Sequence, residues 1–361
     1  MVRRRVSARA VLLGVLVLSL VAGVVVVGVL VWQRQHRTDL DKALDAVPAR
    51  SLRVGFTDWG TVRTRLKARL DASPDKAAIE AFMSRAYDSD FSAASSVDEA
   101  AAALQENYGF GPATAQWEAY AQSRRGAAMV LDVGDDADFD ELAGNLRSLG
   151  YKRPKDEDGV WRGGADLVAQ IDPTITPELQ HVVLLADRGL VVSSDNAGYA
   201  AEAARAASGD SPSLGDKDGI AALSDRLGHP ANALLWSDDF ACDDLAMSHA
   251  DSDDQARAEQ LVRKAGGVTP LSGLAMAMEP DRTLRVVVHF EDAERARKNL
   301  RPRARLAVGE AVGRGVSFSD SFRLTGSRAV GSEVVLDLEP RDPTGFVLSA
   351  LYDGPVLFAT C

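Results

Sequence analysis

Two cysteines and a run of acidic residues are the side chains whose types and spacing suggest chemistry. The 361-residue chain contains only Cys242 and the C-terminal Cys361. In an oxidising compartment they are expected to form a disulfide, which for so long a loop stabilises by about 4 to 5 kcal/mol in the chain-entropy model. A catalytic thiol is the alternative. Neither cysteine lies in a nucleophile signature, and nearby carboxylates would raise the pKa of Cys242, so the disulfide is favoured.

Carboxylates around Cys242 form the candidate site of the sequence: Asp238, Asp239, Asp243 and Asp244. An acidic loop beside a disulfide is either a cation site or an exposed polar segment, and both interpretations stay open. A second acidic run, Asp251 to Asp254, either coordinates calcium or begins a helix, and capping is favoured. The acids between Asp135 and Glu141 lack the glycine and glutamate of a calcium loop, so we expect them at a helix N-terminus.

Known catalytic signatures are missing from the sequence. It contains no Gly-x-Ser-x-Gly elbow, no phosphate-binding glycine loop and no His-Glu-x-x-His pair. The five histidines are scattered, and His181 and His289 lie in strand-like segments, where a half-buried structural imidazole is more common than a ligand. We therefore assign no catalytic residue, no cofactor and no metal, and an enzyme is disfavoured.

An uncharged run of 23 residues from Ala10 to Trp32 predicts a transmembrane helix. At about 1.5 Å of rise per residue, such a helix covers the roughly 30 Å hydrocarbon core of a bilayer. Four arginines precede the run, at positions 3, 4, 5 and 9, and only Arg34 and Arg37 follow closely. The positive-inside rule then places residues 1–9 in the cytoplasm and the C-terminal part outside the cell membrane.

A cleavable signal peptide is the alternative to this anchor, with Val21-Ala22-Gly23 as the cleavage site. The apolar run continues from Val24 to Val31 instead of ending there, and Trp32 suits the outer interface, so an uncleaved single-pass anchor is favoured.

The part of the chain beyond residue 37 is acidic. It contains 35 basic and 52 acidic residues, a net charge of −17. Such a charge disfavours nucleic acid and anionic lipid surfaces as partners, and favours solubility or cationic partners. A solvated acidic surface is the simpler interpretation.

The elements that would position these residues indicate an α+β ectodomain with a mainly antiparallel sheet. A juxtamembrane stalk is expected over 33–50, a first half over 51–208, a connecting segment over 209–230 and a second half over 231–361. Residues 51–57 are strand-like, and 58–122 is expected to be mostly helical. Trp59, Trp117 and Trp161 are expected to be core or turn anchors.

The two halves share an order of elements that suggests a duplicated unit of strand, helix, hairpin and helix. The first copy comprises 127–133, 139–149, the hairpin 181–194 and 199–207. The second comprises 284–290, 292–300, the hairpin 322–338 and 343–352, and further strands are expected at 231–237 and 271–279. Hairpins join the strands as often as helices do, which indicates an α+β fold.

Several motifs resemble a family of uncharacterised actinobacterial membrane-anchored proteins, of the domain-of-unknown-function type. They are Leu52-Arg53-Val54 through Thr57-Asp58-Trp59, Trp117-Glu118, the turn from Gly159 to Gly164, and Phe240-Ala241-Cys242. The resemblance spans most of the ectodomain. It implies an anchored cell-envelope protein, and it assigns no catalytic residue or ligand.

Three functions are compatible with these features. The first is a single-pass membrane protein whose extracytoplasmic domain binds an envelope protein or a wall ligand. The second is an envelope hydrolase whose acid and base, among Asp238, Asp239 and Asp58, meet only in the fold. The third is a structural spacer. The first is favoured because the predicted location is clear and catalytic motifs are lacking.

Overall fold

The computed structural model describes residues 37–361 except 246, 248–249, 343 and 353–354. The chain divides into two compact units, Met1–Thr38 and Asp39–Cys361. Within the described residues, the second unit contains thirteen α-helices and thirteen strands. None of the described helices is both long and apolar enough to cross a membrane, and the predicted span 10–32 lies outside the described residues.

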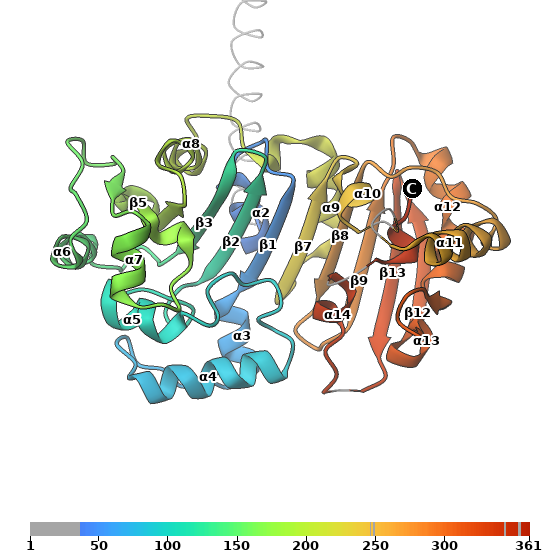
Figure 1. Ribbon diagram of the computed structural model, residues 1–361, viewed down its shortest axis with the longest axis horizontal. Helices are drawn as coiled ribbons and strands as arrows, with labels where there is room; N and C mark the ends of the chain where they lie inside the picture. Colours follow the sequence, from blue (N-terminus) through green and yellow to red (C-terminus); the bar gives the residue numbers. More distant parts are fainter. Residues whose placement is uncertain (1–36, 246, 248–249, 343, 353–354) are drawn as a thin grey trace, which may run out of the picture. The chain divides into compact units, whose positions relative to one another are not determined.

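One antiparallel sheet of eleven strands organises residues 39–361 (Figure 1). Its spatial order is β12 (Phe322–Val330), β13 (Glu333–Pro340), β9 (Leu284–His289), β8 (Gly273–Met278), β7 (Asn232–Ser237), β1 (Arg53–Asp58), β2 (Trp117–Ser123), β3 (Gly126–Asp132), β6 (Leu190–Ser194), β5 (His181–Leu185) and β4 (Trp161–Arg162). The short strands β10 (Glu310–Ala311) and β11 (Val316–Ser317) form a separate pair. The predicted α+β class with a mainly antiparallel sheet is confirmed.

The two predicted halves belong to one continuous sheet. Strand β1 of the first half pairs with β7 of the second, with Gly55 opposite Leu234 and Arg53 opposite Trp236. The buried residues on each face of the sheet come from both halves. The two halves therefore share their cores.

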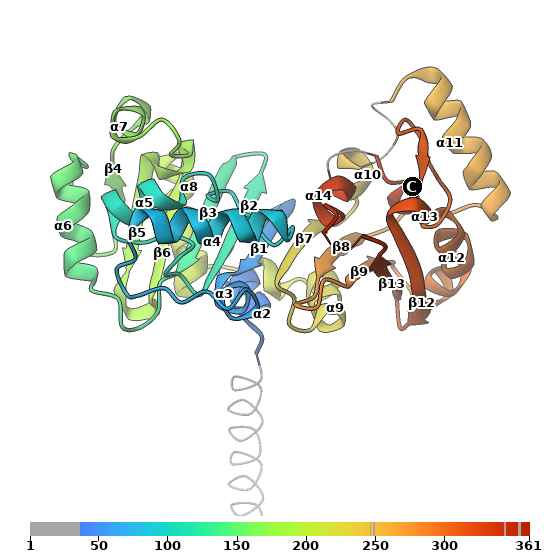
Figure 2. The same cartoon turned by 90° about the horizontal axis from the view of Figure 1, so that it is seen from below.

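Helices cover both faces of this sheet, and each face buries its own apolar cluster. One face is covered by α2 (Asp39–Asp45), α8 (Ala197–Ser208) and α9 (Asp218–Leu227), and Figure 2 shows α2 and α9 together on that side. The other face carries α3 (Trp59–Arg65), α4 (Lys76–Asp88), α5 (Ala101–Tyr108), α6 (Phe139–Leu149), α7 (Ala165–Ile171), α10 (Phe240–Asp244), α11 (Ser252–Ala265), α12 (Ala293–Leu306), α13 (Phe318–Ser321) and α14 (Leu348–Tyr352).

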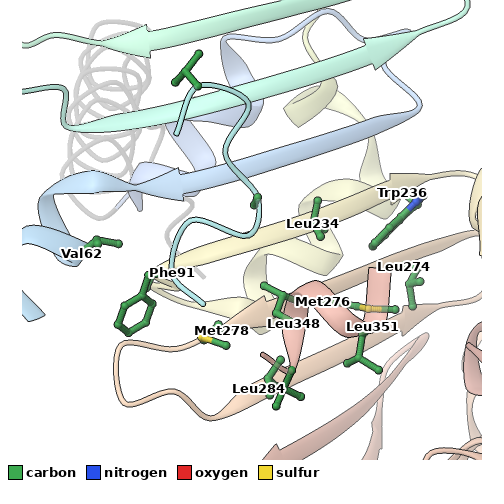
Figure 3. Packing of buried hydrophobic residues seen from close by; sticks show 14 of the residues in the cluster. Val62, Phe91, Leu234, Trp236, Leu274, Met276, Met278, Leu284, Leu348 and Leu351 are labelled. Atoms are coloured by element: carbon green, nitrogen blue, oxygen red, sulfur yellow. The ribbon is translucent and has the colours of Figure 1, made fainter. Parts of the chain in front are cut away.

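The strands in the middle of the sheet are apolar on both sides because helices cover both sides. In β8 the side chains of Leu274 and Met276 pack with Leu348 and Leu351 of α14 (Figure 3). The alternate residue Ala275 contributes to the opposite cluster. A strand buried on both faces has a nearly continuous apolar sequence, and this pattern predicts the strand over residues 271–279.

Three tryptophans predicted as core anchors are buried, which confirms that prediction. Trp59 is 0% exposed, Trp117 is 2% exposed and Trp161 is 3% exposed. The ring of Trp59 lies 6.0 Å from that of Phe82 in an edge-to-face arrangement, which joins the start of α3 to α4. Large aromatic side chains contribute much of the apolar area that a core removes from water.

The expected stalk over 33–50 is wrong from residue 39 onward. Residues 39–45 do form a helix, α2, but its Leu40 and Leu44 are each only 1% exposed and pack against the sheet. Pro48 bridges to Ser213, so the chain after α2 is also bound to the domain. Residues 39–50 are therefore part of the folded domain, because the apolar face of α2 packs against its core.

The connecting segment expected over 209–230 is likewise part of the domain. Residues 218–227 form α9, and Ile220, Leu223 and Leu227 are buried against the sheet. The first part of the segment is a loop with one short 3-10 turn, Leu214–Asp216.

The prediction that 58–122 is mostly helical missed β2. This strand, Trp117–Ser123, lies between β1 and β3 near the centre of the sheet. Its second residue is Glu118, and a charged residue at a buried position hides the strand pattern from the sequence.

The predicted disulfide between Cys242 and Cys361 is confirmed. Their Cα atoms are 5.7 Å apart, and the bridge ties the chain end to α10. Arg303 of α12 holds the same terminal segment: it is 0% exposed and donates hydrogen bonds to the carbonyl oxygens of Phe358 at 2.6 Å and Thr269 at 2.7 Å. Burial lowers the pKa of Arg303 to about 9. The C-terminal segment is thus fixed by a covalent bond and by a buried guanidinium.

Removing the bridge should destabilise the protein. The two cysteines are 119 residues apart, so replacing both with serine should lower the free energy of unfolding by about 4 to 5 kcal/mol in the chain-entropy model. Urea denaturation of the full chain in detergent, before and after reduction, provides the measurement. A double variant with the same midpoint as the oxidised protein would contradict the expectation.

Candidate functional site

A cavity of about 1500 Å³ lies mainly on the first half of the domain, beside the end of β1, and Asp39 and Pro280 also line it. Its walls come from α3, the segment between α3 and α4, α5, and the loop that leads from β3 into α6. The connection between β1 and β2, residues 59–116, supplies most of this lining. The cavity is therefore built from an insertion between two neighbouring strands of the sheet.

The lining combines apolar and charged side chains. Leu70, Ile79, Phe110 and Leu142 are among the apolar ones. Eight acidic residues line it: Asp39, Asp58, Asp71, Asp75, Glu106, Asp136, Asp138 and Glu141. Among the described residues, three basic ones line it: Arg63, Arg65 and Lys76. The cavity therefore carries an excess of negative charge.

Asp58 is placed in the cavity by its position at the end of β1, where it caps α3. Its carboxylate accepts hydrogen bonds from the backbone N–H of Thr61 at 2.7 Å and from the Thr61 hydroxyl at 2.8 Å. Burial raises the pKa of Asp58, and these hydrogen bonds oppose the rise. An N-cap explains the residue, so its perturbed pKa alone does not indicate catalysis.

The structure separates Asp58 from Asp238 and Asp239, the residues among which the hydrolase hypothesis sought its acid and base. Asp58 is the last residue of β1. Asp238 follows the last residue of β7, and that end of β7 pairs with Arg53 at the start of β1. At about 3.3 Å per residue, the length of the strand separates Asp58 from the other two by roughly 20 Å. Asp58 therefore lies at the opposite end of these central strands from Asp238 and Asp239, and it cannot form an acid and base pair with either of them.

The predicted acidic cluster around Cys242 does not converge. Asp238 accepts from Lys217 Nζ at 2.8 Å, while Asp244 accepts from the indole N–H of Trp236 at 2.6 Å. Asp239 lies at the start of α10, and Asp243 lies within this helix. Among the described residues, no three His, Cys, Asp or Glu side chains are grouped so as to hold a metal ion. In the described structure these residues therefore make separate local contacts.

The other acidic runs cap helices, as predicted. Asp251 accepts from the backbone N–H groups of Asp253 and Asp254 at the start of α11. Asp138 accepts from the N–H of Glu141 at the start of α6. His181 and His289 lie in β5 and β9, which confirms their predicted placement.

The buried carboxylate of Glu118, which no motif singled out as a site residue, lies beside the cavity-forming insertion. Glu118 is 1% exposed and accepts four hydrogen bonds, from Trp59 Nε1 (3.1 Å), Ser95 Oγ (2.7 Å), Ser96 N (2.7 Å) and Ser96 Oγ (2.9 Å). Burial raises the pKa of Glu118, and the four donors oppose the rise. Because all four donors come from the insertion, Glu118 fixes the insertion to the sheet.

Asp90 fixes the same insertion to the second half. Its backbone oxygen accepts from Asn232 Nδ2 in β7 at 2.9 Å, and its buried carboxylate accepts from the N–H groups of Val347 and Leu348 at the start of α14. Asp90 has a φ of +58°, a left-handed conformation that aspartate tolerates better than most residues. Only contacts distant in sequence reveal this role.

Comparisons with known proteins add little to this geometry. No family model and no curated protein matches the chain. Two crystal structures of TP0453 are similar in part. Crystal form I has a TM-score of 0.39 at 8% identity and covers 86% of this chain and 97% of that one; form III has the same TM-score at 10% identity and covers 85% and 98%. A likeness at this TM-score carries no argument about fold or function.

Replacing Glu118 with glutamine should destabilise the protein. Each carboxylate oxygen of Glu118 faces an N–H donor, so the amide nitrogen of Gln would face Trp59 Nε1 or Ser96 N and leave donors unpaired. We expect a loss of about 1 to 3 kcal/mol in the free energy of unfolding near neutral pH.

Glu118→Gln should also change how the free energy of unfolding depends on pH. The folded-state pKa of Glu118 is raised. Between the ordinary glutamate pKa and this raised pKa, the folded protein binds more protons than the unfolded protein does. The free energy of unfolding therefore falls as pH rises through this range. Glu118→Gln should remove this part of the slope in denaturation measured from pH 4 to 8. Glu106→Gln, at an exposed lining residue, is the matched control. An unchanged slope in Glu118→Gln would contradict the role of the buried charge.

Proposed function

We propose that this chain is a single-pass membrane protein whose residues 39–361 form an extracytoplasmic domain that binds a cell-envelope partner in the cavity on its first half. The uncharged run 10–32 and its arginine-rich flank support the anchor and its orientation. The single observation that carries the binding proposal is the cavity of about 1500 Å³.

The size and composition of the cavity favour binding of a large partner. Sites for small molecules typically occupy roughly 300 to 1,000 Å³. This cavity exceeds that range, and its lining offers both apolar and charged surface. Its walls are loops and short helices held on a rigid sheet, which is where binding sites are commonly found.

We also propose that the domain arose from a duplicated unit, because its two halves share an order of strands and helices. Counted outward from the junction, the strand order is β1-β2-β3-β6-β5 on one side and β7-β8-β9-β13-β12 on the other. Helix α6 lies between β3 and β5 in the chain, and α12 lies between β9 and β12. Among its described residues, the connection between β7 and β8 contains α10 and α11 as its α-helices. It spans residues 238–272 and is shorter than the β1–β2 connection, 59–116, so the cavity belongs to the copy with the longer insertion.

Site-specific photo-crosslinking in living cells tests the proposed function. Benzoylphenylalanine at Ala72, which lines the cavity and is exposed, should capture one defined partner in the membrane fraction. The control position is Ala256, an exposed residue of α11 in the second half. Equal capture from both positions, or none from Ala72, would contradict binding in the cavity. Recovery of the full chain outside the membrane fraction would contradict the anchor.

A further inference from the structure

Half of the eight acidic residues that line the cavity have a structural role. Asp58, Asp75 and Asp138 accept hydrogen bonds from backbone N–H groups at the starts of α3, α4 and α6. Asp39 accepts from Lys42 Nζ at 2.7 Å. Capping and local pairing are sufficient reasons for these four carboxylates to be present.

A fifth acid, Glu141, lies in the first turn of α6, where negative charge is favourable. The remaining three acids have no such role: Asp71, Glu106 and Asp136. They come from the α3–α4 segment, from α5 and from the loop before α6, and all three are exposed. Within the part of the chain that the structure describes, their carboxylates form no hydrogen bond or ion pair. These carboxylates from three segments give the cavity a negative charge that is complementary to a cationic ligand.

Two of the three basic residues of the lining contact groups other than these acids. The guanidinium of Arg63 donates to the carbonyl oxygens of Pro112 at 3.0 Å and Ala115 at 2.6 Å. Lys76 lies 3.8 Å from Glu80, one helical turn along α4. Arg65 is exposed at the rim. Two of the three cations are therefore engaged elsewhere.

We propose that the cavity binds a lysine- or arginine-rich segment of a partner protein. Lysine and arginine combine apolar stems with a charged end, so the stems can pack on Leu70, Ala72 and Val133 while the charged ends reach Asp71, Glu106 and Asp136. The volume suits several residues of an extended chain better than a single small amine. This inference rests on the proposed function and names the chemistry of its partner.

The test uses the full chain in nanodiscs of zwitterionic lipid, with fluorescein-labelled hexalysine and hexaglutamate as probes. Hexalysine should bind with an affinity that falls as salt concentration rises, and hexaglutamate should not bind. The triple variant Asp71→Asn/Glu106→Gln/Asp136→Asn removes three charges without removing a helix cap. It should weaken hexalysine binding by about tenfold or more.

The matched control is Glu157→Gln/Asp158→Asn/Asp225→Asn, which neutralises three exposed acids outside the cavity lining. It should change hexalysine affinity by less than about threefold. An equal loss in both triple variants would show attraction by the overall negative charge and overturn the proposal, as would an absence of hexalysine binding. Binding of spermine but not hexalysine would instead indicate a small polyamine and contradict a peptide.

The hexalysine test and the crosslinking test of the proposed function can fail independently of each other. If Ala72 captures a partner in cells while hexalysine fails to bind, the basic chemistry of the partner is wrong and cavity binding stands. If hexalysine binds through Asp71, Glu106 and Asp136 but Ala72 captures nothing, the cavity recognises cations and the envelope partner is contradicted.

Discussion

The charge of Glu118 constrains the rest of this domain. A carboxylate in a core is costly unless donors surround it, and here the donors come from Trp59, Ser95 and Ser96. Satisfying it pulls the 89–97 segment onto the sheet, where the carbonyl oxygen of Ala94 lies so close to Gly55 that a Cβ there would be 2.4 Å away. The same segment then reaches β7 and α14 through Asp90. The buried carboxylate of Glu118 thereby fixes residues 89–97 where they cross β2, β1 and β7, and we call this segment the crossing.

The cavity depends on this crossing. Trp59, which donates to Glu118, is the first residue of α3, and Asp58 before it caps the same helix. The wall of the cavity is thus attached to the sheet at the point where the buried charge is satisfied. The second half has a matching strand order, but its β7–β8 connection contains α10 and α11 and is tied down by the disulfide instead. Two similar halves have different loops, and the proposed binding site lies in one of them.

Patterns local in sequence predicted much of the fold, and contacts distant in sequence account for what was missed. Apolar runs and hairpin turns identified β3, β5, β6, β7, β8, β9, β12 and β13, and the two cysteines identified the disulfide. Strand β2 was missed because Glu118 interrupts its apolar pattern, and that residue is buried only because of donors about 22 or 59 residues away. The cavity was missed for the same reason: its acids are dispersed from 39 to 141. The acidic run at 238–244 was conspicuous because it is contiguous, yet its members have separate partners.

Native-state hydrogen exchange tests most directly whether this crossing joins the two halves into one cooperative unit. We expect amides of β1 and β2 and those of β7 and β8 to exchange through one common opening, with the same free energy and the same dependence on denaturant. Strands of the second half opening at a clearly lower free energy than β1 and β2 would show two independent domains, and would contradict a single sheet held together by Glu118 and Asp90.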